Sequence, residues 1–348
     1  MTRTSAARPG KKKNTTAIVV IGASAGGRQA LVELLAQLDR DFPAPILIVQ
    51  HMAATASAEV MVRVLGAATA LRCQAAADGA VPLPGHVYVA LPDQHMMLVE
   101  NRIRITKGAR ENRARPAIDP LFRSAAVAYG NRVIAVVLSG YLDDGTAGME
   151  AVHRCGGLCV VQDPLDAEYP DMPRNVINNA WVDRCVPIAK MGPVLLELAG
   201  RKPRKPRPAP RDVVIESRIA ERVLSDLPSV EALGTLVPFN CPGCGGVLWQ
   251  IAKAGELRYR CHTGHAYTAQ TLLAEQTAKM EETLWVALRM FEENRKLLVK
   301  MEKEGAPGSS FPERLAQSGI HIARIRAMLH QQTEQDAEPA AKPRARKK

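Results

Sequence analysis

The first half of the chain alternates short aliphatic runs with longer amphipathic stretches. Continuous apolar runs bounded by turn residues are typical of strands that are buried on both faces of a sheet. We expect such strands at residues 17–21, 46–50, 87–90, 133–139 and 158–162. Helical periodicity between and after them predicts helices at 28–38, 58–65, 120–128, 145–154 and 189–198. This alternation predicts an α/β fold with a doubly wound, mostly parallel sheet, whose sites form at the carboxyl ends of the strands.

Local signals define the start of one of these helices and add a hairpin to this domain. Asp119 precedes Pro120, which predicts a helix that begins at Pro120 with Asp119 as its N-cap. Two short apolar stretches at 97–100 and 102–105 are separated by Asn101 and predict a small hairpin.

The second half of the chain has a different pattern. Apolar positions recur at helical spacing through 270–303 and again through 312–329, with a Gly- and Ser-containing break between them. The chain therefore divides into a disordered basic tail (1–14), the α/β domain (15–200), a Pro-rich basic linker (201–212), a short helix followed by a compact Cys/His module (213–268), a helical hairpin (269–332) and a second disordered basic tail (333–348).

The net charge of +11 at first suggests a nucleic-acid partner. However, residues 1–14, 201–211 and 342–348 together carry 16 basic and no acidic residues, so the rest of the chain has a net charge of −5. The basic surplus therefore lies in tails and linker, and we expect solvated flexible charge without a dedicated nucleic-acid site. No apolar run approaches the roughly 20 residues of a membrane span, and no secretory signal core is present, so we expect a cytoplasmic protein.

A glycine turn connects the first strand to the first helix. Gly22, Ser24 and Gly26 fit the G-x-S-x-G pattern, in which small neighbours keep a serine hydroxyl accessible and let N–H groups approach an oxyanion. The alternative is a phosphate-binding turn. A dinucleotide site would usually show an acidic residue at the end of the second strand, whereas this strand ends in Gln50-His51. The turn therefore favours a nucleophile.

Two further polar groups follow neighbouring strands. His51 ends the strand at 46–50, where it can act as a general base for Ser24, although a simple rim histidine is the alternative. The strand at 133–139 leads into Asp143 and Asp144, and either carboxylate could orient His51 or merely cap the next helix. The order Ser, His, Asp differs from that of α/β-hydrolases.

The Cys/His module carries a metal-binding pattern. Cys241 and Cys244 form a C-x₂-C knuckle, and Cys261 and His265 form a C-x₃-H pair, with His262 as a rival fourth ligand. Four such ligands suit tetrahedral zinc and leave no open position, so we expect a structural zinc in a small zinc-ribbon-like module.

The first 200 residues resemble the catalytic domain of bacterial chemotaxis protein-glutamate methylesterases of the CheB type. The stretches that carry this resemblance are GASAGG (22–27), QHM (50–52), GHVYVALPDQH (85–95), RPAIDPLFRSAA (115–126), LSGYLDDGTAGM (138–149) and QDPLDAEYPDMPRNVI (162–177).

The resemblance implies a Rossmann-like domain with Ser24 as nucleophile, His51 as base and Asp144 as acid. It implies hydrolysis of glutamate methyl esters on methyl-accepting chemoreceptors or related signalling proteins, deamidation of glutamine as a side activity, and no cofactor for catalysis. Met172 and Pro173 would shape the mouth of the site.

Two features depart from the family pattern. Ala25 stands where these enzymes commonly have Thr. About 14 residues precede the domain, so we expect no receiver domain there. The alternative function is a non-enzymatic signalling adaptor that uses the same fold and the Cys/His module with its helices.

Overall fold

The computed structural model describes residues 17–203, 205–221, 227–253, 256–304 and 310–337. They form two compact units, and the boundary between these units in the sequence lies between Leu272 and Leu273. The predicted tail at 1–14, and residues 338–348 of the second predicted tail, lie outside the described residues. In the described part of the chain, no helix combines the length and apolarity that crossing a membrane requires.

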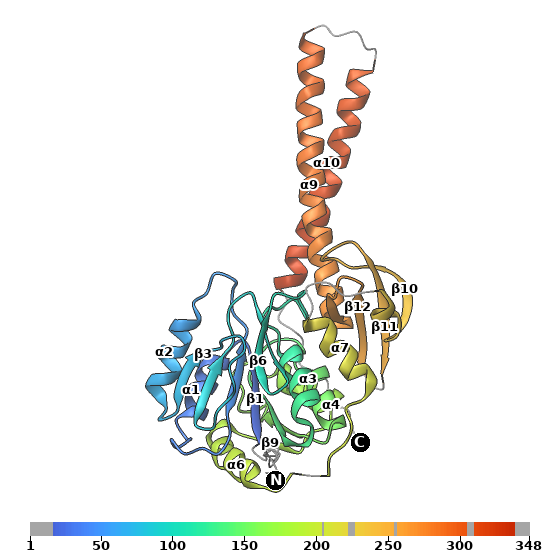
Figure 1. Cartoon of the computed structure of the whole chain (residues 1–348). Coiled ribbons are helices and arrows are strands. Elements are labelled where there is room, and N and C mark those ends of the chain that lie inside the picture. Colours follow the sequence, from blue (N-terminus) through green and yellow to red (C-terminus); the bar gives the residue numbers. More distant parts are fainter. Residues whose placement is uncertain (1–16, 204, 222–226, 254–255, 305–309, 338–348) are drawn as a thin grey trace, which may run out of the picture. The chain divides into compact units, whose positions relative to one another are not determined.

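A seven-stranded sheet forms the centre of the first unit, with the strand order β3-β4-β2-β1-β7-β8-β9 (Figure 1). Every pair of neighbouring strands in it is parallel, which confirms the predicted doubly wound sheet. The strands are β1 (Ile18–Ala23), β2 (Ile46–Gln50), β3 (Arg72–Ala75), β4 (His86–Val89), β7 (Val133–Val137), β8 (Leu158–Gln162) and β9 (Arg184–Val186). The central strands β1, β2 and β7 are buried throughout, as their unbroken apolar runs require.

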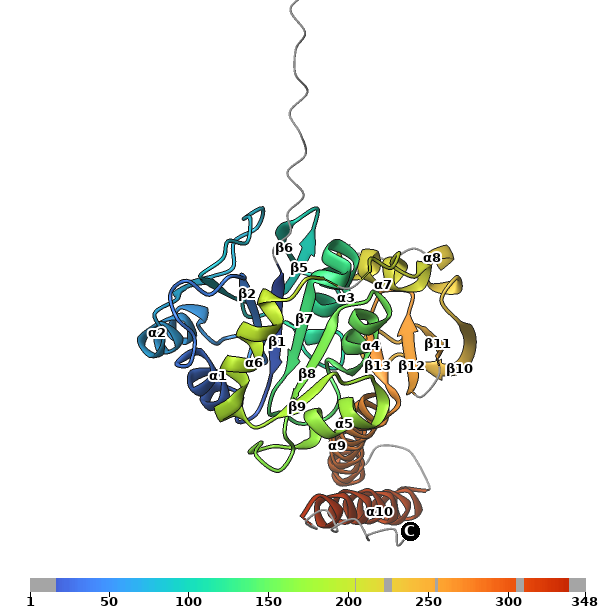
Figure 2. The same ribbon diagram turned by 90° about the horizontal axis from the view of Figure 1, so that it is seen from below.

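Helices cover both faces of this sheet (Figure 2). One apolar core joins the sheet to α1 (Gly27–Leu35), α2 (Ala58–Ala68) and α6 (Ile188–Gly200). The other core joins it to α3 (Ile118–Tyr129), α4 (Thr146–Arg154), α5 (Asp171–Asn179) and the hairpin of β5 (His95–Val99) and β6 (Arg102–Thr106). A short 3₁₀ helix, η1 (Gly130–Arg132), follows α3.

The prediction that Asp119 caps a helix was wrong. α3 begins at Ile118 after an N-cap at Ala117, so Asp119 lies inside the first turn, where it is buried. Its Oδ1 accepts hydrogen bonds from the N–H groups of Gly145 (3.1 Å) and Gly148 (2.6 Å) at the start of α4. A tertiary contact, rather than a local cap, therefore fixes this side chain.

The first unit also contains the Cys/His module. Its antiparallel sheet has the order β10-β11-β12-β13, built from β10 (Thr235–Asn240), β11 (Val247–Lys253), β12 (Glu256–Cys261) and β13 (Ala266–Thr268). Two helices precede the sheet, α7 (Arg211–Glu221) and α8 (Leu227–Glu231). Ile219, Val230 and Trp249 share a small apolar core, so these helices pack on the sheet.

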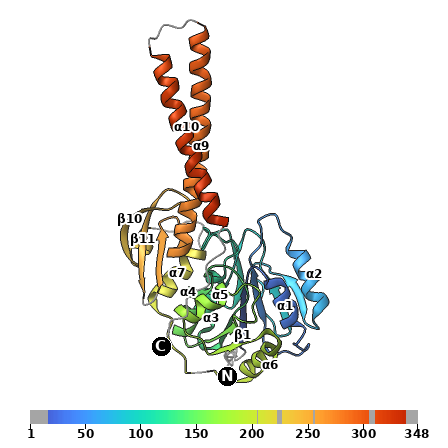
Figure 3. The ribbon, with the colours of Figure 1, turned by 180° about the vertical axis from the view of Figure 1, so that it is seen from behind.

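The second unit contains all of α9 (Ala269–Lys303) from Leu273 onward and α10 (Phe311–Ala337), two long helices that run side by side (Figure 3). The two predicted helices are confirmed, and α10 continues eight residues past the predicted end at Leu329. Leu288, Ile325 and Leu329 form a buried seam between them, and Arg326 donates to Glu292 across the pair.

Candidate active site

Ser24 lies in the turn between β1 and α1, directly after the last residue of β1. The Ser24 N–H donates to Ser139 O (2.9 Å), and Ser24 O accepts from Gln50 Nε2 (2.7 Å), so neighbouring strand ends hold this backbone from both sides. A Cβ at Gly22 would lie 2.4 Å from Ile118 Cγ2, and Gly26 has a φ of 70°. Close helix packing and a left-handed turn therefore explain the two glycines that flank the serine.

Gly140 closes the other side of the serine. A Cβ at this position would lie 2.7 Å from Ser24 Cβ and 2.2 Å from Met172 Sδ. The backbones of Gly140 and Met172 are also bonded directly, because the Met172 N–H donates to Gly140 O (3.0 Å). Only glycine fits between the serine and the buried methionine. That Met172 and Pro173 shape the mouth of the site stays a prediction.

His51 directly follows β2, the strand beside β1. Ala23 and Gln50 are register partners, and the His51 N–H donates to Ala23 O (2.9 Å), so Ser24 and His51 occupy neighbouring strand ends. His51 Nε2 lies 2.7 Å from Asp144 Oδ2. The imidazole is about one-fifth exposed and the carboxylate is buried. The remaining ring nitrogen, Nδ1, is therefore the atom with which His51 can take a proton.

The structure joins two members of the predicted triad directly. In the described part of the chain, no hydrogen bond connects Ser24 Oγ to His51. Catalytic hydrogen bonds are often long without substrate and tighten in the complex with substrate. The missing bond is therefore compatible with a base at His51, because Ser24 and His51 lie at neighbouring strand ends.

Asp144, and not Asp143, faces His51. Besides the imidazole, the Asp144 carboxylate accepts from the N–H of Ile118 (2.7 Å) and from Asn112 Nδ2 (3.0 Å). Burial alone would raise the pKa of Asp144, but the hydrogen bonds and the charge of His51 outweigh it and hold that pKa below its usual value. Asp144 thus stays ionised and can stabilise a protonated His51.

Asp143 has a different environment. Burial raises its pKa to about 6, and this rise outweighs the opposite influence of Thr268 in β13. The neighbouring charge of Asp144 adds to this rise. Asp143 therefore belongs to the contact between the two sheets of the first unit rather than to the imidazole.

Sequence reasoning left Asn112, Asp119 and His95 without roles at this site. His95 is buried, and its two ring nitrogens contact Ala109 O (2.9 Å) and Ala117 N (3.2 Å), which fixes the loop before α3. Asn112 contacts both Asp119 and Asp144. No local sequence pattern marks these residues, because their roles depend on contacts between separate elements.

The four predicted metal ligands form one cluster. The ligand atoms of Cys241, Cys244, Cys261 and His265 all lie within 4.8 Å of one another. Cys244 Sγ and Cys261 Sγ are 3.7 Å apart, and Cys261 Sγ lies 3.5 Å from His265 Nδ1. Thiolates bound to zinc at about 2.3 Å in a tetrahedron lie about 3.8 Å apart, so this spacing fits a closed four-ligand metal site.

Comparisons with known proteins cover the first half of the chain. The family model described as CheB methylesterase matches residues 19–195. A putative protein-glutamate methylesterase/protein-glutamine glutaminase of Leptospira interrogans is 36% identical over 181 residues, which are 52% of this chain and 93% of that protein. The protein-glutamate methylesterase/protein-glutamine glutaminase of group 2 operon from Rhodospirillum centenum is 36% identical over 192 residues.

The chain spans about half the length of several curated relatives that it matches, including 48% of the Rhodospirillum centenum protein. Among solved structures, the CheB methylesterase catalytic domain of Thermotoga maritima matches with a TM-score of 0.51 and 34% identity. That match covers 53% of this chain and 98% of the solved chain.

Proposed function

The chain belongs to the CheB methylesterase family, and from this premise we propose that it hydrolyses glutamate methyl esters on chemoreceptors and deamidates glutamine at the same site. The observation that carries the proposal is the pair of His51 and Asp144, 2.7 Å apart, at strand ends beside Ser24. This arrangement supplies a nucleophile, a base and a buried ionised acid on three neighbouring strands.

The reaction follows from the roles of these three groups. The Ser24 hydroxyl oxygen attacks the ester carbonyl while His51 Nδ1 takes the hydroxyl proton. The tetrahedral intermediate then expels methanol, which receives that proton from His51, and leaves a glutamyl ester on Ser24. Water, deprotonated by His51, attacks this ester and releases the glutamate carboxylate and Ser24. With a glutamine substrate the leaving group is ammonia.

The start of α1 offers an oxyanion site. The N–H of Ala25 follows the nucleophile and, among the described residues, donates no hydrogen bond. It lies one residue before the N-cap of α1, Gly26, where the helix dipole favours negative charge. We propose that this N–H binds the carbonyl oxygen as charge develops on it.

A signalling adaptor without catalysis is the second candidate. The missing hydrogen bond between Ser24 Oγ and His51 is the observation that favours it. An adaptor would bind a methylated receptor and release no methanol from it.

Labelling with a serine-directed fluorophosphonate, together with methanol release from a methylated receptor, separates the two. The esterase requires both signals in the parent protein and their loss in Ser24→Ala and His51→Ala. His330→Ala, which changes an exposed histidine of α10, is the matched control and should keep both. Receptor binding without methanol release or labelling would establish the adaptor instead.

We further propose that the Cys/His cluster holds a structural zinc ion. Cys241, Cys244, Cys261 and His265 would bind it, and it would cross-link the two knuckles of the module without taking part in the reaction. The predicted division into an α/β domain (15–200) and a module (213–268), and a cytoplasmic location, belong to the same proposal.

A further inference from the structure

The side-chain amide of Asn112 lies between two buried carboxylates. Its Nδ2 donates to Asp144 Oδ1 (3.0 Å) and to Asp119 Oδ2 (3.0 Å), and all three residues are buried. Two carboxylates so close together in a low-dielectric interior repel each other. A primary amide offers one N–H to each, so it satisfies both without adding charge.

The backbone of Asn112 is held by the Cys/His module. The Asn112 N–H donates to Ala266 O (2.9 Å), and the Ala266 N–H donates to Arg110 O (3.4 Å). The segment at 110–112 thus pairs with β13, which begins directly after the candidate metal ligand His265. Asn112 has a φ of 48°, a left-handed conformation that Asn and Asp adopt more readily than other residues with a side chain.

Thr268 of the same strand lies near the acid loop, since it influences the pKa of Asp143, the residue before Asp144. The hydrogen-bonded support of Asp144 by strand β13 therefore runs through Asn112.

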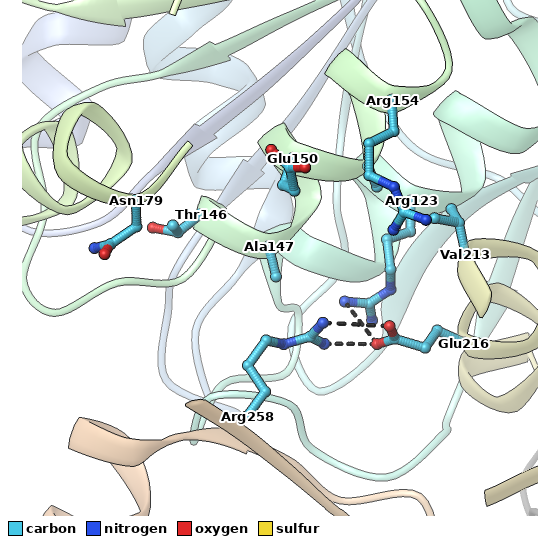
Figure 4. Close-up of a pocket in the computed structure, with 10 residues that line it drawn as sticks. Arg123, Thr146, Ala147, Glu150, Arg154, Asn179, Val213, Glu216 and Arg258 are labelled. Carbon is cyan, nitrogen blue, oxygen red and sulfur yellow. Dashed lines mark hydrogen bonds and ion pairs between the residues drawn. The ribbon is translucent and has the colours of Figure 1, made fainter. Parts of the chain in front are cut away.

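Buried ion pairs fasten these elements together. Glu111, next to Asn112, accepts from Arg123 of α3 and from Arg260 of β12 (3.1 Å). Figure 4 shows Arg123 and Arg258 converging on Glu216 of α7 beside a small pocket. Each carboxylate here is paired with more than one guanidinium, so displacing any one element would leave a buried charge with fewer partners, which is strongly destabilising.

From these contacts we propose that Asn112 is a positioning residue for the acid of the triad, and that strand β13 of the Cys/His module holds Asn112 in place. The inference rests on the proposed esterase function. The Cys/His module would then support catalysis through Asn112. Among the described residues, no hydrogen bond joins the module directly to the serine turn. The charged groups that surround the amide are Asp119 and Asp144, with Glu111, Arg123 and His51 beyond them.

Asn112→Asp tests the first part. Aspartate keeps the size and tolerates the left-handed backbone, but it replaces two donors with a third carboxylate. We expect kcat for methyl-ester hydrolysis to fall roughly tenfold to a hundredfold with little change in KM. We also expect the acid limb of the pH–rate profile to move to higher pH, because the three carboxylates cannot all ionise.

Asn101→Asp is the matched control, because it makes the same change at an exposed left-handed position (φ 62°) in the turn between β5 and β6. It should keep the kcat and the pH profile of the parent. A folded Asn112→Asp protein with the parent's kcat, or with a loss that is the same at every pH, overturns the inference. A parent protein that releases no methanol overturns the esterase function itself, and the inference with it.

Hydrogen exchange tests the second part without any use of activity. A chelator, or Cys244→Ser, should speed amide exchange in a peptide that spans residues 108–116, because the Asn112 N–H loses its fixed acceptor. Exchange in a peptide that covers α2 should stay unchanged. Equal exchange at 108–116 before and after treatment, with metal removal verified by metal analysis, would show that the module does not hold this segment.

Discussion

Asp144 Oδ2 lies 2.7 Å from Nε2 of His51, so Nδ1 is the ring nitrogen that the acid does not contact. In serine proteases the two ring nitrogens have the opposite assignment, with the acid at Nδ1. For the same chemistry, the imidazole of His51 must therefore face the serine with Nδ1 rather than with Nε2. The His51 N–H is bonded to Ala23 O, so the backbone of His51 lies beside the residue that precedes the nucleophile.

Asp144→Asn should lower kcat roughly 10³- to 10⁴-fold, because the amide neither stabilises a protonated imidazole nor fixes its tautomer. Asp143→Asn should cost far less, since His51 lies against the carboxylate of Asp144 and not against that of Asp143. Methanol release by the two variants measures the difference. An equal loss in both would mean that the assignment of the acid to Asp144 is mistaken.

Gly140→Ala should damage both stability and activity. The new Cβ would lie 2.2 Å from Met172 Sδ and 2.7 Å from Ser24 Cβ, and overpacking of this kind typically costs about 1–3 kcal/mol. Adding Met172→Ala should restore part of the stability but not the activity, since the clash with the serine stays. Thermal unfolding and methanol release separate the two effects.

The control for this substitution is Gly319→Ala in α10, where an added Cβ meets nothing within 4 Å. Alanine should stabilise that helix by about 0.5–1 kcal/mol. If Gly140→Ala behaved like the control, the close packing around the serine would not matter for folding or catalysis.

The central sheet, and the strand ends at which the three proposed triad residues lie, could be predicted from the sequence because they depend on local patterns. Unbroken apolar runs predicted β1, β2 and β7, and parallel strands bring their carboxyl ends to one edge. Ser24, His51 and Asp144 each follow one of these runs. Strands β3 and β9 were missed, because they are short strands at the sheet edges whose residues are partly or fully exposed.

The support of the acid could not be predicted in the same way. Asn112 acts through Ala266, and Glu111 through Arg260, which lie about 150 residues away along the chain. Asn and Glu are common residue types in polar loops, so their identity alone does not indicate a role. Only the folded arrangement of the two sheets gives these residues neighbours with which a role can be argued.

The raised pKa of Asp143 predicts a pH-dependent effect on stability. Its native pKa of about 6 exceeds the ordinary value of 3.8, so the native state binds more protons between these limits and stability falls as the pH rises through them. Asp143→Asn removes this loss. It should therefore raise the melting temperature relative to the parent at pH 8 and do so much less at pH 4.

The exposed Asp41 provides the control for Asp143→Asn, because Asp41→Asn removes one surface charge without changing a buried group. Thermal unfolding of parent and both variants at the two pH values is the measurement. A melting temperature of Asp143→Asn that is lower than the parent's by the same amount at both pH values would contradict the proposed linkage.

Metal content tests the Cys/His cluster. The purified chain should contain one zinc ion, since four ligand atoms within 4.8 Å of one another match a closed tetrahedral site. Cys261→Ser should lose the metal and lower the melting temperature, because metal binding contributes directly to the folding of such small modules. Cys185→Ser, at an exposed cysteine outside the cluster, should keep both the metal and the melting temperature of the parent. A metal-free parent that a chelator does not destabilise would refute the zinc site. It would also mean that the antiparallel sheet and its buried ion pairs stabilise the module without a metal.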